Sequence, residues 1–204
     1  LKFAIIIFLS ATISNHQDKM RTFRYGMLPG LVLLMISAVL LYFQPNFSAV
    51  VTLALLVFVM MLVGGANLLH FGIMGVLGIA GGAVAMVASG YRMNRILAFT
   101  DPWKYSGDLS YQLIQSLYSI GSGGLVGLGL GNSRQKFLFL PYSESDCIFA
   151  IIVEELGYVG GVMVLVVFGL LIWRGVRVAL RAPNTFGMML ATGITALIAI
   201  QVFI

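Results

Sequence analysis

The run from residue 147 to residue 173, CIFAIIVEELGYVGGVMVLVVFGLLIW, decides the fold, because it carries only two charged side chains, Glu154 and Glu155. An α-helix needs roughly 20 predominantly apolar residues to cross the hydrocarbon core of a bilayer. The run is long enough and therefore predicts a transmembrane helix. Transmembrane β-strands are shorter and alternate polar with apolar residues, so continuous runs of this kind exclude them.

The composition of the whole chain indicates the same class. Hydrophobic residues make up 60% of the 204 residues and charged residues 9%, and the mean hydropathy is +1.01. This leaves too little polar surface to coat a water-soluble globule. We therefore expect an all-α fold, a polytopic transmembrane helical bundle that forms a single membrane domain over residues 1–204. The predicted spans lie at about residues 1–14, 25–43, 47–66, 68–89, 147–173 and 185–204. The first and last are cut short, so we expect a fragment of a larger protein.

Basic residues predict how the spans are oriented. They cluster before the second span and after the fifth, at Lys19, Arg21, Arg24, Arg174, Arg177 and Arg181. Short loops rich in Lys and Arg face the cytoplasm, which places the long loop 90–146 outside the cell. Within this loop, Asp108 is a helix-capping residue, and apolar residues recur at helical spacing over the next ten positions. We expect an interfacial helix there, lying flat on the membrane.

Acidic and basic residues near the fifth span could carry chemistry. Asp146 stands at the start of that span, where capping of the helix is the simplest explanation. Arg134 and Lys136 lie a short distance upstream and could hold a phosphate group while a carboxylate removes a hydroxyl proton. Glu154 and Glu155 lie inside the span, where an uncompensated charge costs at least about 2 kcal/mol. We expect at least one of these two acids to have an architectural role and to pack against a polar partner.

Other features allow two interpretations each. Arg92 and Arg95 could bind ordinary lipid phosphates or a specific anionic substrate. The glycine-rich stretch 121–131 could let the backbone approach a ligand, or it could form a close-packed bend. Cys147 has no histidine near it in sequence, so a structural role is favoured over a nucleophilic one. With one cysteine and two histidines, the chain has no structural zinc cluster, and we expect neither an organic cofactor nor a nucleic-acid partner.

The segment from Gly129 to Gly160 resembles the SEDS family of shape, elongation, division and sporulation proteins, and the similarity is closest to the FtsW and SpoVE branch. Three features carry the resemblance: the run Gly129-Leu-Gly-Asn-Ser-Arg-Gln-Lys136, the pair Leu140-Pro141 followed by Asp146, and Glu154-Glu-Leu-Gly157. The outer loop adds the family-like elements Tyr91-Arg92, Arg95, Asp101-Pro102-Trp103 and Tyr111-Gln112-Leu113. The similarity runs nearly from end to end of the chain.

This resemblance implies a multi-pass enzyme of the bacterial cytoplasmic membrane that polymerises lipid II into peptidoglycan glycan strands on the outer face. Asp146 matches the family's catalytic acid, and the reaction is an inverting glycosyl transfer from an undecaprenyl-pyrophosphate donor. A divalent cation, Mg²⁺ or Mn²⁺, could be shared by Asp146 and substrate phosphates. The implied partners are a class B penicillin-binding transpeptidase and other division or elongation proteins. The residues expected to bind pyrophosphate or sugar are Arg92, Arg95, Asn132, Arg134, Gln135, Lys136 and Lys2.

Three departures from the family pattern and two other functions stay open at this point. The family's Gln-Pro-Asp-Leu-Gly turn reads Gln44-Pro45-Asn46-Phe47-Ser48, the residues before Asp146 differ, and Cys147 replaces a usual phenylalanine. Intramembrane acids with outer-loop cations also suit a lipid II flippase. A non-catalytic scaffold of a cell-wall synthase would explain the apolar surface equally well.

Overall fold

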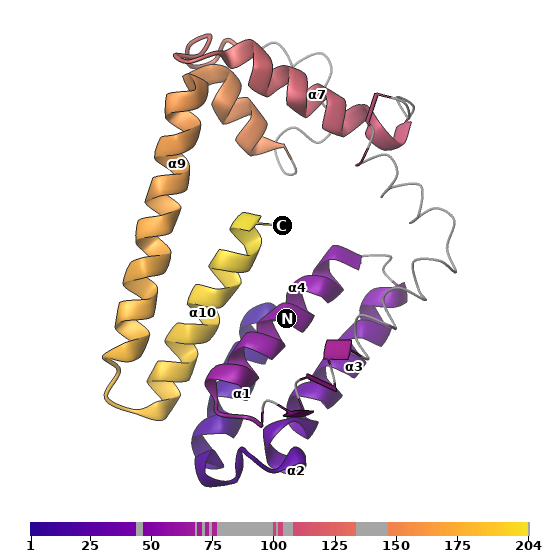
Figure 1. The fold of residues 1–204 in the computed structure, drawn as a ribbon, viewed down its shortest axis with the longest axis vertical. Coiled ribbons are helices and arrows are strands. Elements are labelled where there is room, and N and C mark those ends of the chain that lie inside the picture. The colour runs from indigo at the N-terminus through magenta and orange to yellow at the C-terminus, as the bar shows by residue number, and fades with distance from the viewer. Residues whose placement is uncertain are drawn as a thin grey trace. The chain divides into compact units, whose positions relative to one another are not determined.

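The computed structural model describes residues 1–43, 47–67, 69–70, 72–73, 75–76, 100, 102–103, 108–133 and 147–203 (Figure 1). Every regular element in these ranges is a helix, and the longer helices are apolar, so the predicted all-α fold class is confirmed. The chain divides into two compact units, one formed by residues 1–78 and 168–204 and the other by residues 79–167. Each unit is described by itself.

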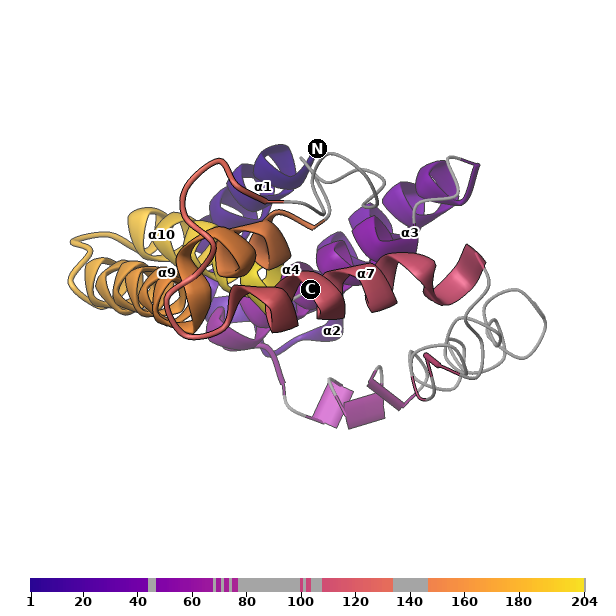
Figure 2. The same cartoon turned by 90° about the horizontal axis from the view of Figure 1, so that it is seen from above.

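The first unit packs helices from both ends of the chain around one apolar core. Its elements are α1 (Lys2–Asn15), the 3-10 helix η1 (Gln17–Lys19), α2 (Phe23–Gly26), α3 (Leu28–Phe43), α4 (Phe47–Val63), the second half of α9 (Ile148–Leu180) and α10 (Thr185–Phe203). Helices α1, α4 and α10 contact one another, and Leu9, Met60 and Met189 between them are fully buried (Figures 1 and 2).

A small residue lets α10 approach its two neighbours closely. A Cβ atom at Gly193 would lie 2.6 Å from Cγ2 of Ile6 in α1 and 3.0 Å from Sδ of Met60 in α4. Both separations are shorter than ordinary van der Waals contact. Small residues at helix interfaces are typical of membrane proteins, where close backbone packing replaces the hydrophobic effect as the force between helices.

Among the residues that the structure describes, two helices are long and apolar enough to cross a membrane. Helix α9 has 33 residues and α10 has 19. The core helix of a soluble protein would be mostly buried, but only 17% of the most apolar window of α9 and 22% of that of α10 are buried. Their apolar side chains instead face outward, as lipid-facing side chains do. Shorter apolar helices occupy Lys2–Asn15, Leu28–Leu41 and Ser48–Val63.

The second unit contains α7 (Asp108–Gly123), a glycine-rich loop and the first half of α9. Helix α7 begins at the predicted capping residue Asp108 and continues to Gly123, beyond the amphipathic pattern that suggested it. Its buried positions include Ser110, Ile114 and Ser119, so polar side chains share the covered face with apolar ones. Most of the predicted span 68–89 lies outside the described residues, as do 44–46, 90–99 and 134–146.

Candidate functional site

The predicted site residues fall into two groups. Those outside the described residues are Arg92, Arg95, Arg134, Gln135, Lys136 and Asp146. Those that the structure describes are Lys2, Asn132, Glu154 and Glu155. Of the second group, Asn132, Glu154 and Glu155 belong to the unit of residues 79–167, whereas Lys2 is half-buried at the start of α1 in the other unit.

Glu154 is the acid of the pair that packs against polar partners. Its side chain is 1% exposed, and its Oε2 atom accepts hydrogen bonds from the hydroxyls of Ser119, at 2.9 Å, and Ser133, at 2.6 Å. Burying a carboxylate costs several kcal/mol unless hydrogen bonds compensate for lost hydration, and hydroxyl donors supply part of that compensation. Glu154 therefore joins three segments: α7 through Ser119, the glycine-rich loop through Ser133, and α9 itself.

The Ser119 hydroxyl reaches α9 at a second point. Its oxygen also lies 3.1 Å from the backbone carbonyl of Ala150, one helical turn before Glu154. A hydroxyl carries one proton, so it donates to one of the two acceptors at a time. Ser119 is 0% exposed, which protects both contacts from competition with water.

Helix α9 is broken directly after the Glu154-Glu155 pair. Gly157 has φ 72° and ψ −174°, a region of backbone space that is essentially restricted to glycine. In a continuous helix, the N–H groups of Tyr158 and Val159 would donate to the carbonyls of Glu154 and Glu155. The break separates these groups, and each needs a new partner because unsatisfied backbone groups are costly at membrane depth.

The glycine-rich loop supplies those partners on both sides of the break. The N–H groups of Leu128 and Gly129 donate to the carbonyls of Glu154 and Glu155, each at 3.0 Å. In the other direction, Tyr158 N–H donates to the Gly124 carbonyl at 2.9 Å, and Val159 N–H donates to the Leu125 carbonyl at 3.3 Å. Four hydrogen bonds to the loop thus satisfy the two carbonyls and two N–H groups that the break separates.

This pairing requires backbone to lie directly on backbone. A Cβ atom at Gly127 would collide with the carbonyl of Glu155, and one at Gly157 would collide with the N–H of Gly127 and the carbonyl of Leu125. Of the two interpretations of the glycine-rich stretch, the structure therefore shows the close-packed bend over residues 123–129.

Cys147, directly before α9, contacts two side chains of α7. The thiol is buried, and its sulfur lies 3.2 Å from Nε2 of Gln112 and 3.3 Å from Oγ of Ser116. Both partners can donate to sulfur, which is a weak acceptor. These contacts give Cys147 a structural role, in agreement with the favoured interpretation of the sequence.

Ser133 and Cys147 are the described residues on either side of segment 134–146, and both are held in place. Ser133 is 3% exposed and donates to Glu154, while Cys147 accepts from α7. The unit therefore fixes both points at which the segment carrying Arg134, Lys136 and Asp146 enters and leaves it.

Asn132 and Glu155 are the other predicted site residues that the structure describes in this unit. The side-chain amide of Asn132 donates to the Leu128 carbonyl at 3.2 Å, and its backbone N–H donates to the Gly129 carbonyl at the same distance. Asn132 is exposed, so its amide can exchange this local bond for a ligand. Glu155 is half-buried and contributes its backbone carbonyl to the loop pairing. Across the described ranges, no three His, Cys, Asp or Glu side chains gather closely enough to hold a metal ion.

Ser119 and Ser133 were not predicted from the sequence as partners of Glu154. A signal was present, because Gln112, Ser116 and Ser119 recur at spacings of four and three and so form a polar stripe along one face of α7. Such a stripe on an otherwise apolar helix indicates polar partners across an interface.

Comparison with known proteins extends over the whole chain. The family model FtsW/RodA/SpoVE, described as cell cycle protein, matches residues 1–204. Stage V sporulation protein E of Bacillus subtilis (strain 168) is 41% identical over 204 residues, which cover 100% of this chain and 56% of that protein. A probable peptidoglycan glycosyltransferase FtsW of Saccharophagus degradans is 39% identical over 206 residues, covering 100% of this chain and 53% of that protein.

A solved structure supports the fold independently. It comes from work on the structural coordination of polymerization and crosslinking by a peptidoglycan synthase complex. The TM-score is 0.69 at 24% sequence identity, over 98% of this chain and 55% of the solved chain. The present chain spans about half the length of the relatives that it matches.

Proposed function

The chain belongs to the FtsW/RodA/SpoVE family, and on that premise we propose that the whole protein is a peptidoglycan glycosyltransferase that polymerises lipid II into glycan strands. The observation that carries this proposal is the match of the family model to every residue, together with relatives named as probable peptidoglycan glycosyltransferases. The polymerisation reaction would take place at the outer face of the bacterial cytoplasmic membrane and would serve division, shape or sporulation.

The proposed chemistry assigns the central role to Asp146. Its carboxylate takes the proton from the acceptor sugar hydroxyl, whose oxygen attacks the anomeric carbon of the donor while the bond to the lipid pyrophosphate breaks. A single displacement of this kind inverts the anomeric centre. Arg134 and Lys136, with Arg92 and Arg95, offset the charge that develops on the leaving pyrophosphate. Asn132, Gln135 and Lys2 are the further proposed contacts to substrate.

The described geometry supports this role through preorganisation. General base catalysis depends on holding the carboxylate within hydrogen-bond reach of the proton that it removes. The Ser133–Glu154 hydrogen bond and the contacts of Cys147 fix the flanks of segment 134–146 against α7 and α9. We assign Glu154 to this positioning task and not to proton transfer, because its oxygen is buried among serine hydroxyls.

A divalent cation remains a proposal. The carboxylate of Asp146 and the phosphates of the substrate are the oxygen ligands that Mg²⁺ or Mn²⁺ prefers, and such an ion would offset the charge of the pyrophosphate. The proposed partners follow from the same premise: lipid II as substrate, a class B penicillin-binding transpeptidase, and other division or elongation proteins. A multi-pass location in the cytoplasmic membrane agrees with the two long apolar helices.

A lipid II flippase is the second candidate, and one observation favours it. Transporters often carry discontinuous helices near the bilayer midplane, with polar groups gathered at the break. Helix α9 is broken at Gly157, next to the buried Glu154. The flippase differs from the glycosyltransferase in requiring transfer across the bilayer without the formation of a glycosidic bond.

The deciding experiment measures lipid II polymerisation by the purified whole protein together with its transpeptidase partner, on a gel that resolves glycan strands. We expect polymer from the wild type and none from Asp146→Asn, with both proteins present in the membrane in equal amount. Glu144→Gln is the matched control, because it neutralises an acid two residues away and should retain polymerisation.

Two results would contradict the proposal. Polymer formed by Asp146→Asn at the wild-type rate would remove the carboxylate from the mechanism. Absence of polymer from every variant, combined with transfer of labelled lipid II between leaflets of proteoliposomes, would favour the flippase. A scaffold would show neither activity.

A further inference from the structure

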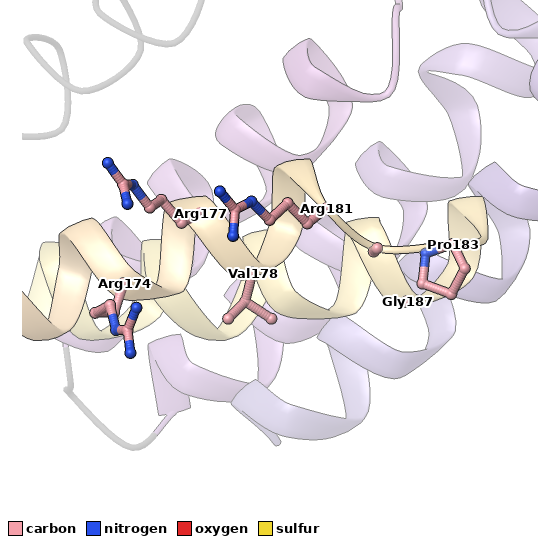
Figure 3. A pocket seen from close by; sticks show the side chains of 7 residues that line it. Arg174, Arg177, Val178, Arg181, Pro183 and Gly187 are labelled. Carbon is pink, nitrogen blue, oxygen red and sulfur yellow. The ribbon is translucent and has the colours of Figure 1, made fainter.

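A hollow of about 420 Å³ lies at the junction between the end of α9 and the start of α10, within the unit of residues 1–78 and 168–204 (Figure 3). Its lining consists of Arg174, Arg177, Val178, Arg181, Ala182, Pro183 and Gly187. None of these seven residues is among the site residues predicted from the sequence.

Three guanidinium groups dominate the charge of this hollow. Arg174, Arg177 and Arg181 are spaced three and four residues apart, so they follow one another along the last turns of α9. Figure 3 shows Arg177 and Arg181 projecting from one side of the helix and Arg174 from the other, and all three residues are exposed. The Arg177 guanidinium lies 4.0 Å from the centre of the Trp173 ring, and this cation–π contact restricts its position.

The positive charge has little local compensation. Asp18 is the only acidic residue in the sequence of this unit, against three arginines in the hollow alone. Within the part of the chain that the structure describes, no carboxylate forms an ion pair with Arg174, Arg177 or Arg181. An anion that enters the hollow therefore meets donors that are not already engaged by a protein carboxylate.

The rest of the lining is apolar. Val178, Ala182 and Pro183 provide hydrocarbon surface beside the guanidinium groups, and Pro183 has no backbone N–H to offer a ligand. Inorganic phosphate would use the cations and leave this surface bare. An amphiphile whose phosphate meets Arg177 and Arg181, while its glycerol and upper acyl chain cover the apolar side, matches both parts of the lining.

The position along the helices agrees with such a ligand. Helices α9 and α10 are the two described helices long and apolar enough to cross a membrane, and the hollow lies at the short connection between them. Connections between membrane helices lie at the headgroup level. We propose that this hollow binds one anionic phospholipid through its phosphate. This inference depends on the membrane location of the chain and not on glycosyl transfer.

Arginines at the end of a membrane helix also have two general roles. They complement the negative end of the helix dipole and they set the orientation of the span. Neither role needs a hollow, and neither distinguishes one phospholipid from another. Lipid selectivity therefore separates a binding site from these general effects.

The test exposes the purified whole protein to mixed micelles of phosphatidylglycerol and phosphatidylcholine and counts retained lipids by native mass spectrometry. We expect one phosphatidylglycerol to be retained in preference to phosphatidylcholine. Arg177→Gln with Arg181→Gln should weaken that retention by about fivefold for each arginine removed. Arg21→Gln with Arg24→Gln is the matched control, since it removes two exposed arginines of the same unit that do not line the hollow, and it should retain the lipid.

Additional variants and a competition with inorganic phosphate test the site further. Arg177→Lys with Arg181→Lys preserves the charge and should keep most of the retention, which guards against a folding defect in the glutamine variant. Equal losses in the two glutamine pairs would reduce the effect to general surface attraction and overturn the site. Displacement of the lipid by millimolar inorganic phosphate would also overturn it, because the apolar half of the lining would then contribute nothing. Asp146→Asn should bind the lipid normally, so the result is independent of the proposed enzyme.

Discussion

The hydroxyl of Ser133 lies 2.6 Å from Oε2 of Glu154, and it ties the end of the glycine-rich loop to the inside of an apolar helix. The two residues are 21 positions apart in sequence. Ser119, 35 positions before Glu154, donates to the same oxygen. Ser133 belongs to the family-like run 129–136, and Glu154 belongs to the Glu-Glu-Leu-Gly run of α9, so a hydrogen bond joins these two motifs. In the sequence, Ser133 directly precedes the segment 134–146 that carries Asp146.

Replacement of Ser133 by alanine should destabilise the protein by about 1–3 kcal/mol, because the buried Glu154 oxygen loses a donor without gaining water. Thermal unfolding in detergent measures the effect. Ser122→Ala is the matched control, since Ser122 is exposed and its hydroxyl donates only to the backbone carbonyl of Ser119 among the described residues. Equal stability of the two variants would remove the cluster from the account of the fold.

Glu154→Gln should lower polymerisation through position and not through proton transfer. The amide keeps the shape of the side chain, but its oxygen is a weaker acceptor than a carboxylate for the two serine hydroxyls. We therefore expect a partial loss of rate, roughly 10-fold to 100-fold, with an unchanged pH profile, in contrast to the complete loss in Asp146→Asn. A rate as low as that of Asp146→Asn, or a shifted pH profile, would place Glu154 in the chemistry.

Gly157→Ala should be among the most damaging single substitutions. The φ of 72° with ψ of −174° costs an L-residue about 1–3 kcal/mol, and the added methyl would collide with the Gly127 and Leu125 backbone. Gly169→Ala makes the same change in the same helix, where a Cβ meets nothing within 4 Å. It should stabilise the protein by about 0.5–1 kcal/mol, because alanine favours the helix. We expect the change in unfolding free energy to have opposite signs in Gly157→Ala and Gly169→Ala.

Gly193→Ala should destabilise the packing of α10 against α1 and α4 by about 1–3 kcal/mol, because the new methyl lies too close to Ile6 and Met60. Ile6→Ala removes Cγ2, the atom nearest to the new methyl, so the double variant should lose less stability than the sum of the two single variants. A double-mutant cycle of unfolding free energies tests this coupling, and strictly additive effects would contradict the close approach of these helices.

Cys147 should react slowly with a maleimide in the folded protein, because its thiol is 7% exposed and contacts two side chains of α7. Ser122→Cys in a Cys147→Ala background provides an exposed thiol near the end of α7, in the same unit, and should react rapidly. Cys147→Ala should lower polymerisation only in part, because the thiol contacts help to position the segment that carries Asp146. Complete loss of activity without loss of stability would instead indicate a nucleophilic role.

Much of the fold could be predicted from local patterns. The helix that begins at Asp108 follows from a capping residue and apolar spacing, and α9 follows from a long apolar run with few charges. The break at Gly157 was not predicted, because a glycine inside an apolar helix is common and its conformation depends on what packs against it. The loop that pairs with the break lies about 30 residues away in sequence, beyond the reach of helical periodicity.

The sequence by itself determined the all-α apolar class, the membership of the FtsW/RodA/SpoVE family and the presence of two acids where a charge is costly, because composition, motif and hydropathy are properties of the chain alone. Only the tertiary structure decided that Glu154 and not Glu155 is the buried acid, that Ser119 and Ser133 are its donors, and that the glycines pack against α9. Adjacent helical residues point about 100° apart. Their burial and hydrogen bonding therefore depend on which segments pack against each face of the helix, and those segments come from distant parts of the chain.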